Sequence, residues 1–193
     1  VRIGGLARGT SVIVTAASSS VGLAAIQMVK DAGGVAIATT RGADKRDFLL
    51  AQGADHVIVT DAESLPERAL EVTGGRGADI VFDPVAGPFL ELAAMAVCAG
   101  GLIISYGALH PQPTPFPLRS ALKKGLTIRG YVLFEFTQDP ARLAPGLDYV
   151  SARLASGVFR PVLDRVFAFE DIVAAHRYME SNEQRGKVVV SVP

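Results

Sequence analysis

Three consecutive serines and a nearby glycine form a stretch that could hold a phosphate group. Ser18, Ser19 and Ser20 follow an apolar run at residues 12–17, and Gly22 lies at the start of a segment of helical periodicity. Where a buried strand turns into a helix, backbone N–H groups and the positive end of the helix converge on one point. Small side chains allow close approach there, and serine hydroxyls can donate to phosphate oxygens. The stretch predicts a pyrophosphate site, although serines that only cap the helix would give the same pattern.

The residues after the next apolar run indicate which dinucleotide such a site would hold. A site for NAD normally places Asp or Glu there, where the carboxylate binds the ribose 2′-hydroxyl. This sequence instead has the hydroxyl of Thr40 and the cations of Arg41 and Lys45. Because a planar guanidinium pairs well with a phosphate, we predict NADP rather than NAD. Two alternatives stay open: Asp44 could pair with either cation and reduce the preference, or both cations could be ordinary solvated charges at a helix start.

Apolar runs rich in Val and Ile alternate with amphipathic segments along most of the chain. The runs predict strands at residues 11–17, 35–40, 56–60, 79–83, 102–106 and 127–133. The segments between and after them predict helices at residues 21–32, 43–52, 65–73, 88–99, 119–124 and 141–155. This alternation is typical of a parallel sheet with helices on both faces. We therefore expect an α/β fold with a doubly wound, six-stranded parallel Rossmann sheet.

A proline-rich segment interrupts this rhythm after the fifth predicted strand. Residues 109–118 contain Pro111, Pro113, Pro115 and Pro117. Proline is excluded from helix interiors and central strands, so the segment predicts an extended loop, and long loops in compact domains are often functional. His110 lies in this loop and could act as a proton donor.

The last part of the chain does not continue the Rossmann pattern. Residues 161–169 and 187–192 predict strands, and residues 170–180 predict a helix. We therefore expect a nucleotide-binding domain at residues 1–157 and a segment of another module at residues 158–193. The sequence begins with Val rather than Met, which indicates that it is part of a longer chain.

Composition and charge exclude several classes of protein. The chain has 193 residues, with 19 Lys and Arg against 19 Asp and Glu, and 49% of its residues are hydrophobic. This apolar content excludes disorder, and balanced charge without a basic cluster argues against nucleic-acid binding. No apolar run approaches the roughly 18–20 residues of a spanning helix, so no membrane insertion is expected. No secretory signal opens the sequence, which predicts a cytoplasmic location.

The sequence also predicts no metal site among these residues. The single cysteine, Cys98, lies in an apolar segment, and His56, His110 and His176 are scattered along the chain. None of them has the spacing of metal ligands. We expect Cys98 to fill space in the core, and His56 and His176 to have structural roles.

Several separate blocks of sequence together resemble one superfamily. They are residues 16–27 (AASSSVGLAAIQ), 53–56 (GADH), 73–79 (TGGRGAD), 83–87 (DPVAG), 160–162 (RPV), 175–180 (AHRYME) and 186–189 (GKVV). In this order they resemble the medium-chain dehydrogenase/reductase superfamily, and most of all its quinone oxidoreductase-like branch, which is related to the zinc-type alcohol dehydrogenases. The resemblance extends from about residue 9 to residue 192.

The resemblance implies a domain arrangement and a reaction. A subunit of this superfamily has a GroES-like catalytic domain, then a Rossmann domain, and then a segment that returns to complete the catalytic domain. Residues 158–193 would be that returning segment, and the GroES-like domain itself would be absent from this chain. The implied reaction is hydride transfer between NADP(H) and a small-molecule quinone, enone, carbonyl or alcohol. No residue of this chain is assigned a catalytic role, and the chain alone is expected to be inactive or nearly so.

The resemblance also implies which residues bind the cofactor. They would contact the pyrophosphate, the 2′-phosphate or the nicotinamide end: Ser18, Ser19, Ser20, Val21, Gly22, Thr40, Arg41, Lys45, Val85, Tyr106, Gly107, Ala108, Leu133, Phe134 and Phe136. The sequence departs from the family pattern where Ser19 and Ser20 replace glycines and Ala86 replaces another. Thr60 also stands where many relatives have a tyrosine near the 2′-phosphate, so that contact is expected to be weaker.

Other functions fit the same residues. The chain could be a non-catalytic NADPH-binding protein or an isolated domain, or it could be the enoyl-reductase module of a larger synthase. Short-chain dehydrogenases are disfavoured, because their catalytic Tyr-x-x-x-Lys appears here as Tyr149 and Arg153, and a guanidinium cannot relay protons as lysine does. Asp83, after the fourth predicted strand, is expected to bind backbone or ribose rather than serve as a general acid. A homodimer is expected to form through the edge at residues 127–133.

Overall fold

The computed structural model describes residues 3–193 and contains a six-stranded parallel sheet. Its strands are β1 (Ser11–Val14), β2 (Val35–Thr40), β3 (His56–Val59), β4 (Ala78–Asp83), β5 (Val97–Ser105) and β6 (Thr127–Gly130). They lie in the order β3-β2-β1-β4-β5-β6, and every neighbouring pair is parallel. The order reverses between β1 and β4, which makes this a doubly wound Rossmann sheet and confirms the predicted fold class.

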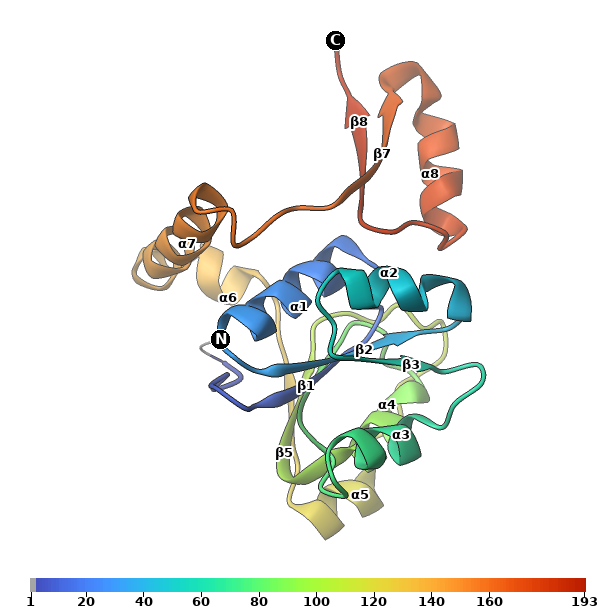
Figure 1. Cartoon of the computed structure of the whole chain (residues 1–193), viewed down its shortest axis with the longest axis vertical. Coiled ribbons are helices and arrows are strands. Elements are labelled where there is room, and N and C mark those ends of the chain that lie inside the picture. The colour runs from blue at the N-terminus through green and yellow to red at the C-terminus, as the bar shows by residue number, and fades with distance from the viewer. Residues whose placement is uncertain (1–2) are drawn as a thin grey trace.

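Helices cover both faces of the sheet (Figure 1). One face carries α1 (Ser20–Asp31), the 3₁₀ turn η1 (Ala43–Lys45) and α2 (Arg46–Ala51), and the other carries α3 (Leu65–Val72), α4 (Phe89–Ala96) and α5 (Leu118–Lys124). The short α6 (Phe134–Thr137) and the long α7 (Pro140–Ala155) follow β6. No helix in residues 3–193 is long and apolar enough to cross a membrane.

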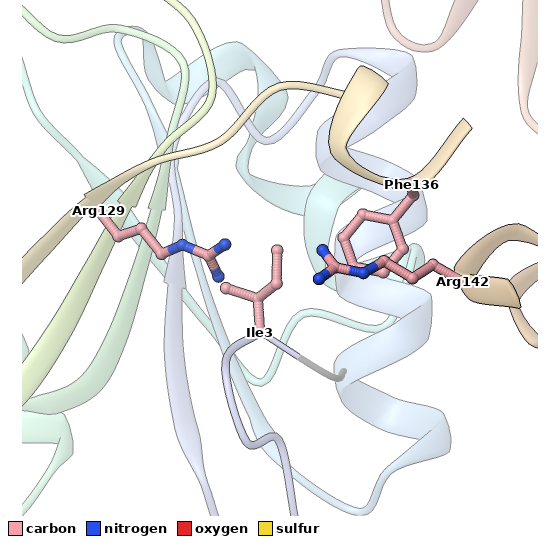
Figure 2. Close-up of a pocket in the computed structure, with 4 residues that line it drawn as sticks. All are labelled: Ile3, Arg129, Phe136 and Arg142. Atoms are coloured by element: carbon pink, nitrogen blue, oxygen red, sulfur yellow. The ribbon is translucent and has the colours of Figure 1, made fainter. Parts of the chain in front are cut away.

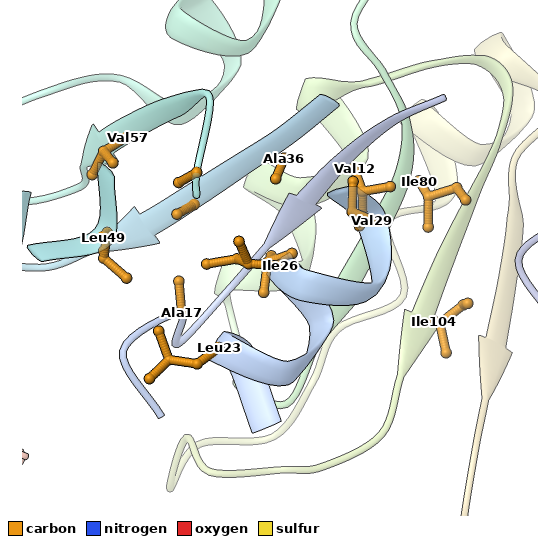
Figure 3. Packing of buried hydrophobic residues seen from close by; sticks show 13 residues of the cluster. Val12, Ala17, Leu23, Ile26, Val29, Ala36, Leu49, Val57, Ile80 and Ile104 are labelled. Atoms are coloured by element: carbon orange, nitrogen blue, oxygen red, sulfur yellow. The ribbon is translucent and has the colours of Figure 1, made fainter. Parts of the chain in front are cut away.

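The core consists of two layers because alternate strand residues point to opposite faces. Val12 belongs to the cluster under α1, whereas Ile13 belongs to the cluster under α3 and α4. On the first face, Leu23, Ile26 and Val29 of α1 pack onto the strands, as Figure 3 shows. These three positions are three residues apart, which is one face of a helix. Burial of both faces explains why the central strands read as continuous apolar runs.

Two boundaries near the crossovers differ from the predicted ones. β1 ends at Val14 rather than at residue 17, because Ala16 has a φ of 47° and turns the chain towards α1. The helix predicted at residues 88–99 ends at Ala96, because the next residue already pairs with β4 and begins β5. The apolar content of residues 97–99 suits a strand as well as a helix, so periodicity alone did not separate the two.

The region after β5 differs most from the prediction. β6 ends at Gly130 rather than at residue 133, and residues 134–137 form α6, which no pattern indicated. The predicted extended loop at residues 109–118 is confirmed up to Pro117, and α5 begins at the next residue, Leu118.

The C-terminal segment forms a small sheet of its own. It contains β7 (Leu163–Ala168), the 3₁₀ turn η2 (Phe169–Asp171), α8 (Ile172–Glu180) and β8 (Lys187–Ser191). β7 and β8 pair in parallel with each other and with no strand of the large sheet, and they stand apart from it in Figure 1. The expectation that this segment lies outside the Rossmann sheet is confirmed, whereas its assignment to a second domain stays a prediction.

Candidate cofactor-binding site

The candidate site lies at the carboxyl ends of β1 and β4. The chain leaves β1 into α1 on one face of the sheet, and it leaves β4 into α4 on the other face (Figure 1). In open α/β sheets this divergence leaves a crevice outside the carboxyl ends of the strands, where ligands bind. The segments that follow β1, β2, β4 and β5 therefore define the site.

Ser19 is the N-cap of α1 at the predicted phosphate turn. Its Oγ accepts a hydrogen bond from the N–H of Gly22 at 3.0 Å. The capping interpretation of this serine is therefore correct, but it does not exclude a phosphate. The first turn of a helix has several N–H groups without intrahelical acceptors, and the cap uses one of them. Ser20 and Val21 begin the helix at this turn, and Val21 is 48% exposed.

Gly22 allows α1 to pack directly against the phosphate turn. A Cβ at this position would lie 2.7 Å from the carbonyl oxygen of Ala16 and 2.7 Å from the Cα of Ala17. Both atoms belong to the backbone, so the helix would have to move away from the turn. Gly22 therefore has the helix-packing role that the last glycine of a dinucleotide fingerprint has.

Lys45 lies in an unexpected environment. Its side chain is buried, and its Nζ donates to Ser18 Oγ at 3.2 Å, to the carbonyl oxygen of Asn182 at 2.6 Å and to that of Gln184 at 3.1 Å. An ammonium has three N–H donors, so these bonds use all of them. Burial lowers the pKa of Lys45 from its usual value. The structure thus places this lysine between the phosphate turn and the C-terminal segment, not in solvent as a second cation beside Arg41.

Arg41 is exposed at the carboxyl end of β2, as predicted. In residues 3–193 its guanidinium takes part in no hydrogen bond or ion pair, so it is available to an anion. The neighbouring Thr40 hydroxyl donates to the carbonyl of Gly42 at 3.2 Å. Thr60, which stands where relatives have a tyrosine, donates its hydroxyl to the carbonyl of Thr40 at 3.2 Å.

Asp83 organises the turn after β4. Its side chain is fully buried, and its Oδ1 accepts from the Thr15 hydroxyl at 2.6 Å and from the Val85 N–H at 3.1 Å. Its Oδ2 accepts from the Ala86 N–H at 2.8 Å. Ala86 has a φ of 57°, a left-handed conformation that these bonds help to hold. As predicted, the Asp83 carboxylate binds backbone N–H groups. Because the side chain is fully buried, neither of its oxygens is exposed to a substrate.

Tyr106, which follows β5, carries an unsatisfied polar atom. Its ring stacks on Phe82 with centroids 4.1 Å apart, and its hydroxyl is buried without a hydrogen-bond partner in the described residues. Burial, and then the nearby Asp83, raise the pKa of this phenol, so it stays neutral. A buried hydroxyl without a partner is costly and indicates a missing ligand group or water.

Gly107, the next residue, packs closely against the turn after β4. A Cβ on Gly107 would lie 3.0 Å from the carbonyl oxygen of Pro84.

The proline-rich loop folds back over the turn after β4. The N–H of His110 donates to the carbonyl of Val85 at 2.9 Å, and the N–H of Gly87 donates to the Thr114 hydroxyl at 2.9 Å. The imidazole of His110 packs on Gly87, where a Cβ would lie only 2.5 Å from the ring. Its Nδ1 accepts a hydrogen bond from the Gln112 N–H at 3.1 Å. His110 therefore lies over the nicotinamide end of the predicted site.

The remaining predicted residues are mostly exposed, and no hydrogen bond joins them to the phosphate turn in residues 3–193. Ala108 is exposed in the loop after β5, and Leu133 and Phe134 are 63% and 64% exposed. Phe136 packs edge-on against Tyr131, with centroids 6.0 Å apart. Figure 2 shows Phe136 lining a pocket of about 310 Å³ together with Ile3, Arg129 and Arg142. The sequence did not indicate this pocket.

Tyr149 and Arg153 hold α7 against α1. The Tyr149 hydroxyl donates to Asp31 Oδ2 at 2.7 Å, Arg153 pairs with the same carboxylate, and the guanidinium lies 3.7 Å from the centroid of the Tyr149 ring. The Tyr149 bond and then the Arg153 bond lower the pKa of Asp31. The pair therefore joins α7 to α1 at a partly exposed surface, since neither side chain is fully buried.

The described residues do not supply a metal centre. In residues 3–193, no three His, Cys, Asp or Glu side chains lie close enough together to hold a metal ion. Cys98 is free and only partly buried, with its Sγ 3.9 Å from Asp79 Oδ1.

Residues near the C-terminus complete the site, and the sequence did not indicate them. Ser19 forms a parallel β-bridge with Gly186, and Arg185 Nη2 donates to Asp44 Oδ2 at 3.3 Å. These contacts join residues more than 140 positions apart, and neither the motif that contains Gly186 nor the one that contains Ser19 indicates that the two meet. A local pattern carries no information on such contacts.

Comparisons with known proteins agree with this geometry. A family model described as zinc-binding dehydrogenase matches residues 52–190. The highly reducing polyketide synthase ZEA2 of Gibberella zeae is 31% identical over 200 residues, which cover 100% of this chain and 8% of the synthase. The crystal structure of an NAD-dependent alcohol dehydrogenase superposes with a TM-score of 0.87 and 32% identity, over 100% of this chain and 54% of that one.

A third relative was solved with a dinucleotide. The Escherichia coli quinone oxidoreductase complexed with NADPH superposes with a TM-score of 0.89 and 26% identity, over 98% of this chain and 59% of that one. The chain thus spans just over half the length of these two structures and less than a tenth of the synthase. Because the family model covers most of the chain and the whole sheet superposes on these oxidoreductases, the chain belongs to the zinc-binding dehydrogenase family of the medium-chain dehydrogenase/reductase superfamily.

Proposed function

We propose that this chain binds NADP(H) across the carboxyl ends of β1, β2, β4 and β5, as the nucleotide-binding part of an oxidoreductase. The observation that carries the proposal is that a capped helix N-terminus at Ser19 occurs together with an exposed Arg41 at the end of β2, whose guanidinium has no partner among residues 3–193. The first suits a pyrophosphate and the second suits a 2′-phosphate. The same positions carry no carboxylate that would select NAD.

The residues present fit such a cofactor. Gly22 keeps α1 tight against the phosphate turn, and the unpartnered Tyr106 hydroxyl offers a hydrogen bond at the other end of the crevice. Asp83 fixes the turn between these two ends. Similarity to an oxidoreductase complexed with NADPH supports the proposal, although another relative is described as NAD-dependent. The other predicted contacts, from Ser18 to Phe136, are part of this proposal, except that of Lys45, whose three N–H donors are already used.

The proposed reaction is hydride transfer. When bound, the nicotinamide would give a hydride to, or take one from, a carbon of a quinone, enone, carbonyl or alcohol. The chain's own residues would bind and orient the dinucleotide, and the loop carrying His110 would cover its reactive end. The similarity to a polyketide synthase favours a second candidate, an enoyl-reductase module acting on an unsaturated thioester.

We also propose a second domain and a dimer. β7, α8 and β8 form a separate sheet with exposed apolar side chains such as Leu163, Val166 and Val173, which suit packing on a further, GroES-like catalytic domain. β6 is an edge strand of the large sheet, so two copies could pair there. Light scattering would test the dimer. The cytoplasmic location stays a prediction.

Titration with NADPH and NADH, followed by fluorescence of the reduced nicotinamide, tests the cofactor. The chain has no Trp, which keeps the background low. We expect NADPH to bind at least tenfold more tightly, equal to about 1.4 kcal/mol, and Arg41→Ala to remove most of that preference. Equal affinity would overturn the assignment to NADP, and binding of neither dinucleotide would overturn the proposed function.

A further inference from the structure

The loop between α8 and β8 reaches the start of η1, beside the proposed 2′-phosphate position. Three contacts fix it there: the bridge between Ser19 and Gly186, and the bonds from Lys45 Nζ to the carbonyls of Asn182 and Gln184. Gly186 has a φ of 130°, and a Cβ on it would lie 2.5 Å from the carbonyl oxygen of Val162. The path of the loop is therefore tightly constrained.

This loop carries a guanidinium to the end of β2. The backbone N–H of Arg185 donates to Asp164 Oδ2 at 3.2 Å, and that oxygen also accepts from the Tyr178 hydroxyl at 2.7 Å. The side chain of Arg185 then extends to Asp44, where its Nη2 donates to the carbonyl oxygen at 3.1 Å and to Oδ2 at 3.3 Å. In residues 3–193 its Nε and Nη1 make no hydrogen bond, and the side chain is 43% exposed. The guanidinium of Arg185 is thus held in place, and its Nε and Nη1 keep N–H groups that can bind a further acceptor.

Lys45 has no free N–H donor for a phosphate among the described residues. The sequence pattern paired Lys45 with Arg41 as the second phosphate-binding cation, but its three N–H groups already bind Ser18, Asn182 and Gln184. Arg185 binds Asp44, the residue next to Lys45, and has free N–H donors that Lys45 lacks in the described residues. Burial is the main cause of the lowered pKa of Lys45; Asp44 and Asp164 oppose it, and Arg185 and Arg41 contribute to it because both lie close by. Three cations, Lys45, Arg41 and Arg185, thus lie close together with two carboxylates, Asp44 and Asp164.

We propose that Arg185 is a specificity-determining residue that, together with Arg41, recognises the phosphate monoester on the ribose of the bound dinucleotide. Lys45 is then a positioning residue, since it holds the loop that delivers Arg185. Asp44 orients the guanidinium in the free protein and competes with the phosphate for it. This inference rests on the proposed NADP(H) function and adds that the C-terminal segment helps to choose the cofactor.

Substitutions on the intact chain test this role. Arg185→Gln should weaken NADPH binding about tenfold and leave NADH binding unchanged, because only NADPH carries the extra phosphate. Asp44→Asn should strengthen NADPH binding about threefold, because it removes a competing negative charge. Arg177→Gln is the matched control, since Arg177 is an exposed arginine on α8 of the same segment, and it should change neither affinity.

The outcomes separate this inference from the function on which it rests. If the unsubstituted chain binds neither dinucleotide, the proposed function fails. If it prefers NADPH and Arg185→Gln keeps that preference, or weakens NADPH and NADH equally, the role of Arg185 is wrong. Thermal unfolding checks that each variant folds. Should Arg185→Gln not fold, Asp44→Asn decides, and an unchanged NADPH affinity in that variant would overturn the inference.

Discussion

The hydroxyl of Thr15 donates a 2.6 Å hydrogen bond to Asp83 Oδ1 and so joins the carboxyl end of β1 to that of β4. Both side chains are fully buried. The phosphate turn follows Thr15, and the turn at residues 84–87 follows Asp83, so one bond links the two ends of the proposed cofactor site. The N–H groups of Val85 and Ala86 complete the ligands of this carboxylate.

Removing that carboxylate should destabilise the protein. Asp83→Ala leaves the N–H groups of Val85 and Ala86 without an acceptor in a buried turn, and it leaves the Thr15 hydroxyl only the carbonyl of Phe82 at 3.4 Å. We expect a cost of about 3 kcal/mol of unfolding free energy. Urea unfolding followed by circular dichroism measures it. Asp61→Ala is the control, because Asp61 is exposed and its side chain makes no hydrogen bond in the described residues; we expect a change below about 0.5 kcal/mol. A loss under 1 kcal/mol for Asp83→Ala would show that the turn does not depend on the carboxylate.

The sequence predicted the layout of this site but not its connections. The alternation of Val-rich runs with helical segments identified all six strands of the sheet, because burial of both faces gives a strong local signal. The position of Ser19 at the start of α1 was predictable because the apolar run before it and the helical periodicity after it are both local signals. Lys45 was not predictable in this way. Its spacing from Arg41 suggested a pair of cations on one helical turn, but the carbonyls of Asn182 and Gln184, which come from the far end of the chain, draw its ammonium away.

Gly22 and Gly146 offer a matched pair of helical glycines. Gly22→Ala would place a Cβ 2.7 Å from the backbone of Ala16 and Ala17, so α1 must shift, and we expect a loss of about 2 kcal/mol and of NADPH binding. Gly146 lies within α7 with no atom within 4 Å of an added Cβ. Gly146→Ala should therefore stabilise the protein by about 0.5–1 kcal/mol and leave binding unchanged. If the two variants behave alike in thermal unfolding and titration, close packing at Gly22 is not what the site requires.

Tyr149→Phe should lower the free energy of unfolding by an amount that depends on pH. The hydroxyl bond to Asp31 contributes about 1 kcal/mol, and it helps to lower the pKa of that carboxyl. A lowered carboxyl pKa stabilises the fold above the ordinary value of about 4, and this contribution is lost as the pH falls through the lower, folded value. The difference in unfolding free energy between the original chain and the variant should thus be largest near neutral pH and shrink towards pH 3.

At alkaline pH, the contribution of the Tyr149 hydroxyl to the free energy of unfolding decreases as the pH rises. Burial and then Asp31 raise the pKa of Tyr149 to about 12, so the stabilisation is complete below the ordinary tyrosine value of about 10 and decreases as the pH rises towards 12. Urea unfolding at several pH values measures the acid and the alkaline dependence of the unfolding free energy. A difference in unfolding free energy that stays the same at every pH would show that the bond between Tyr149 and Asp31 does not shift either pKa.

Lys45→Met should detach the C-terminal loop from the phosphate turn. The thioether keeps the length of the side chain but cannot donate, so Ser18 Oγ and the carbonyls of Asn182 and Gln184 lose a charged donor, each bond to which is worth about 1.5 kcal/mol or more. Since the loop then opens more often, hydrogen exchange should become faster at residues 181–187 and stay slow in β1 and β4. Lys30→Met is the control, because Lys30 forms only a partly exposed ion pair with Asp55 and should not change exchange in the loop. Unchanged protection of residues 181–187 in Lys45→Met would mean that the bridge between Ser19 and Gly186 holds the loop without the lysine, and that Arg185 needs no positioning residue.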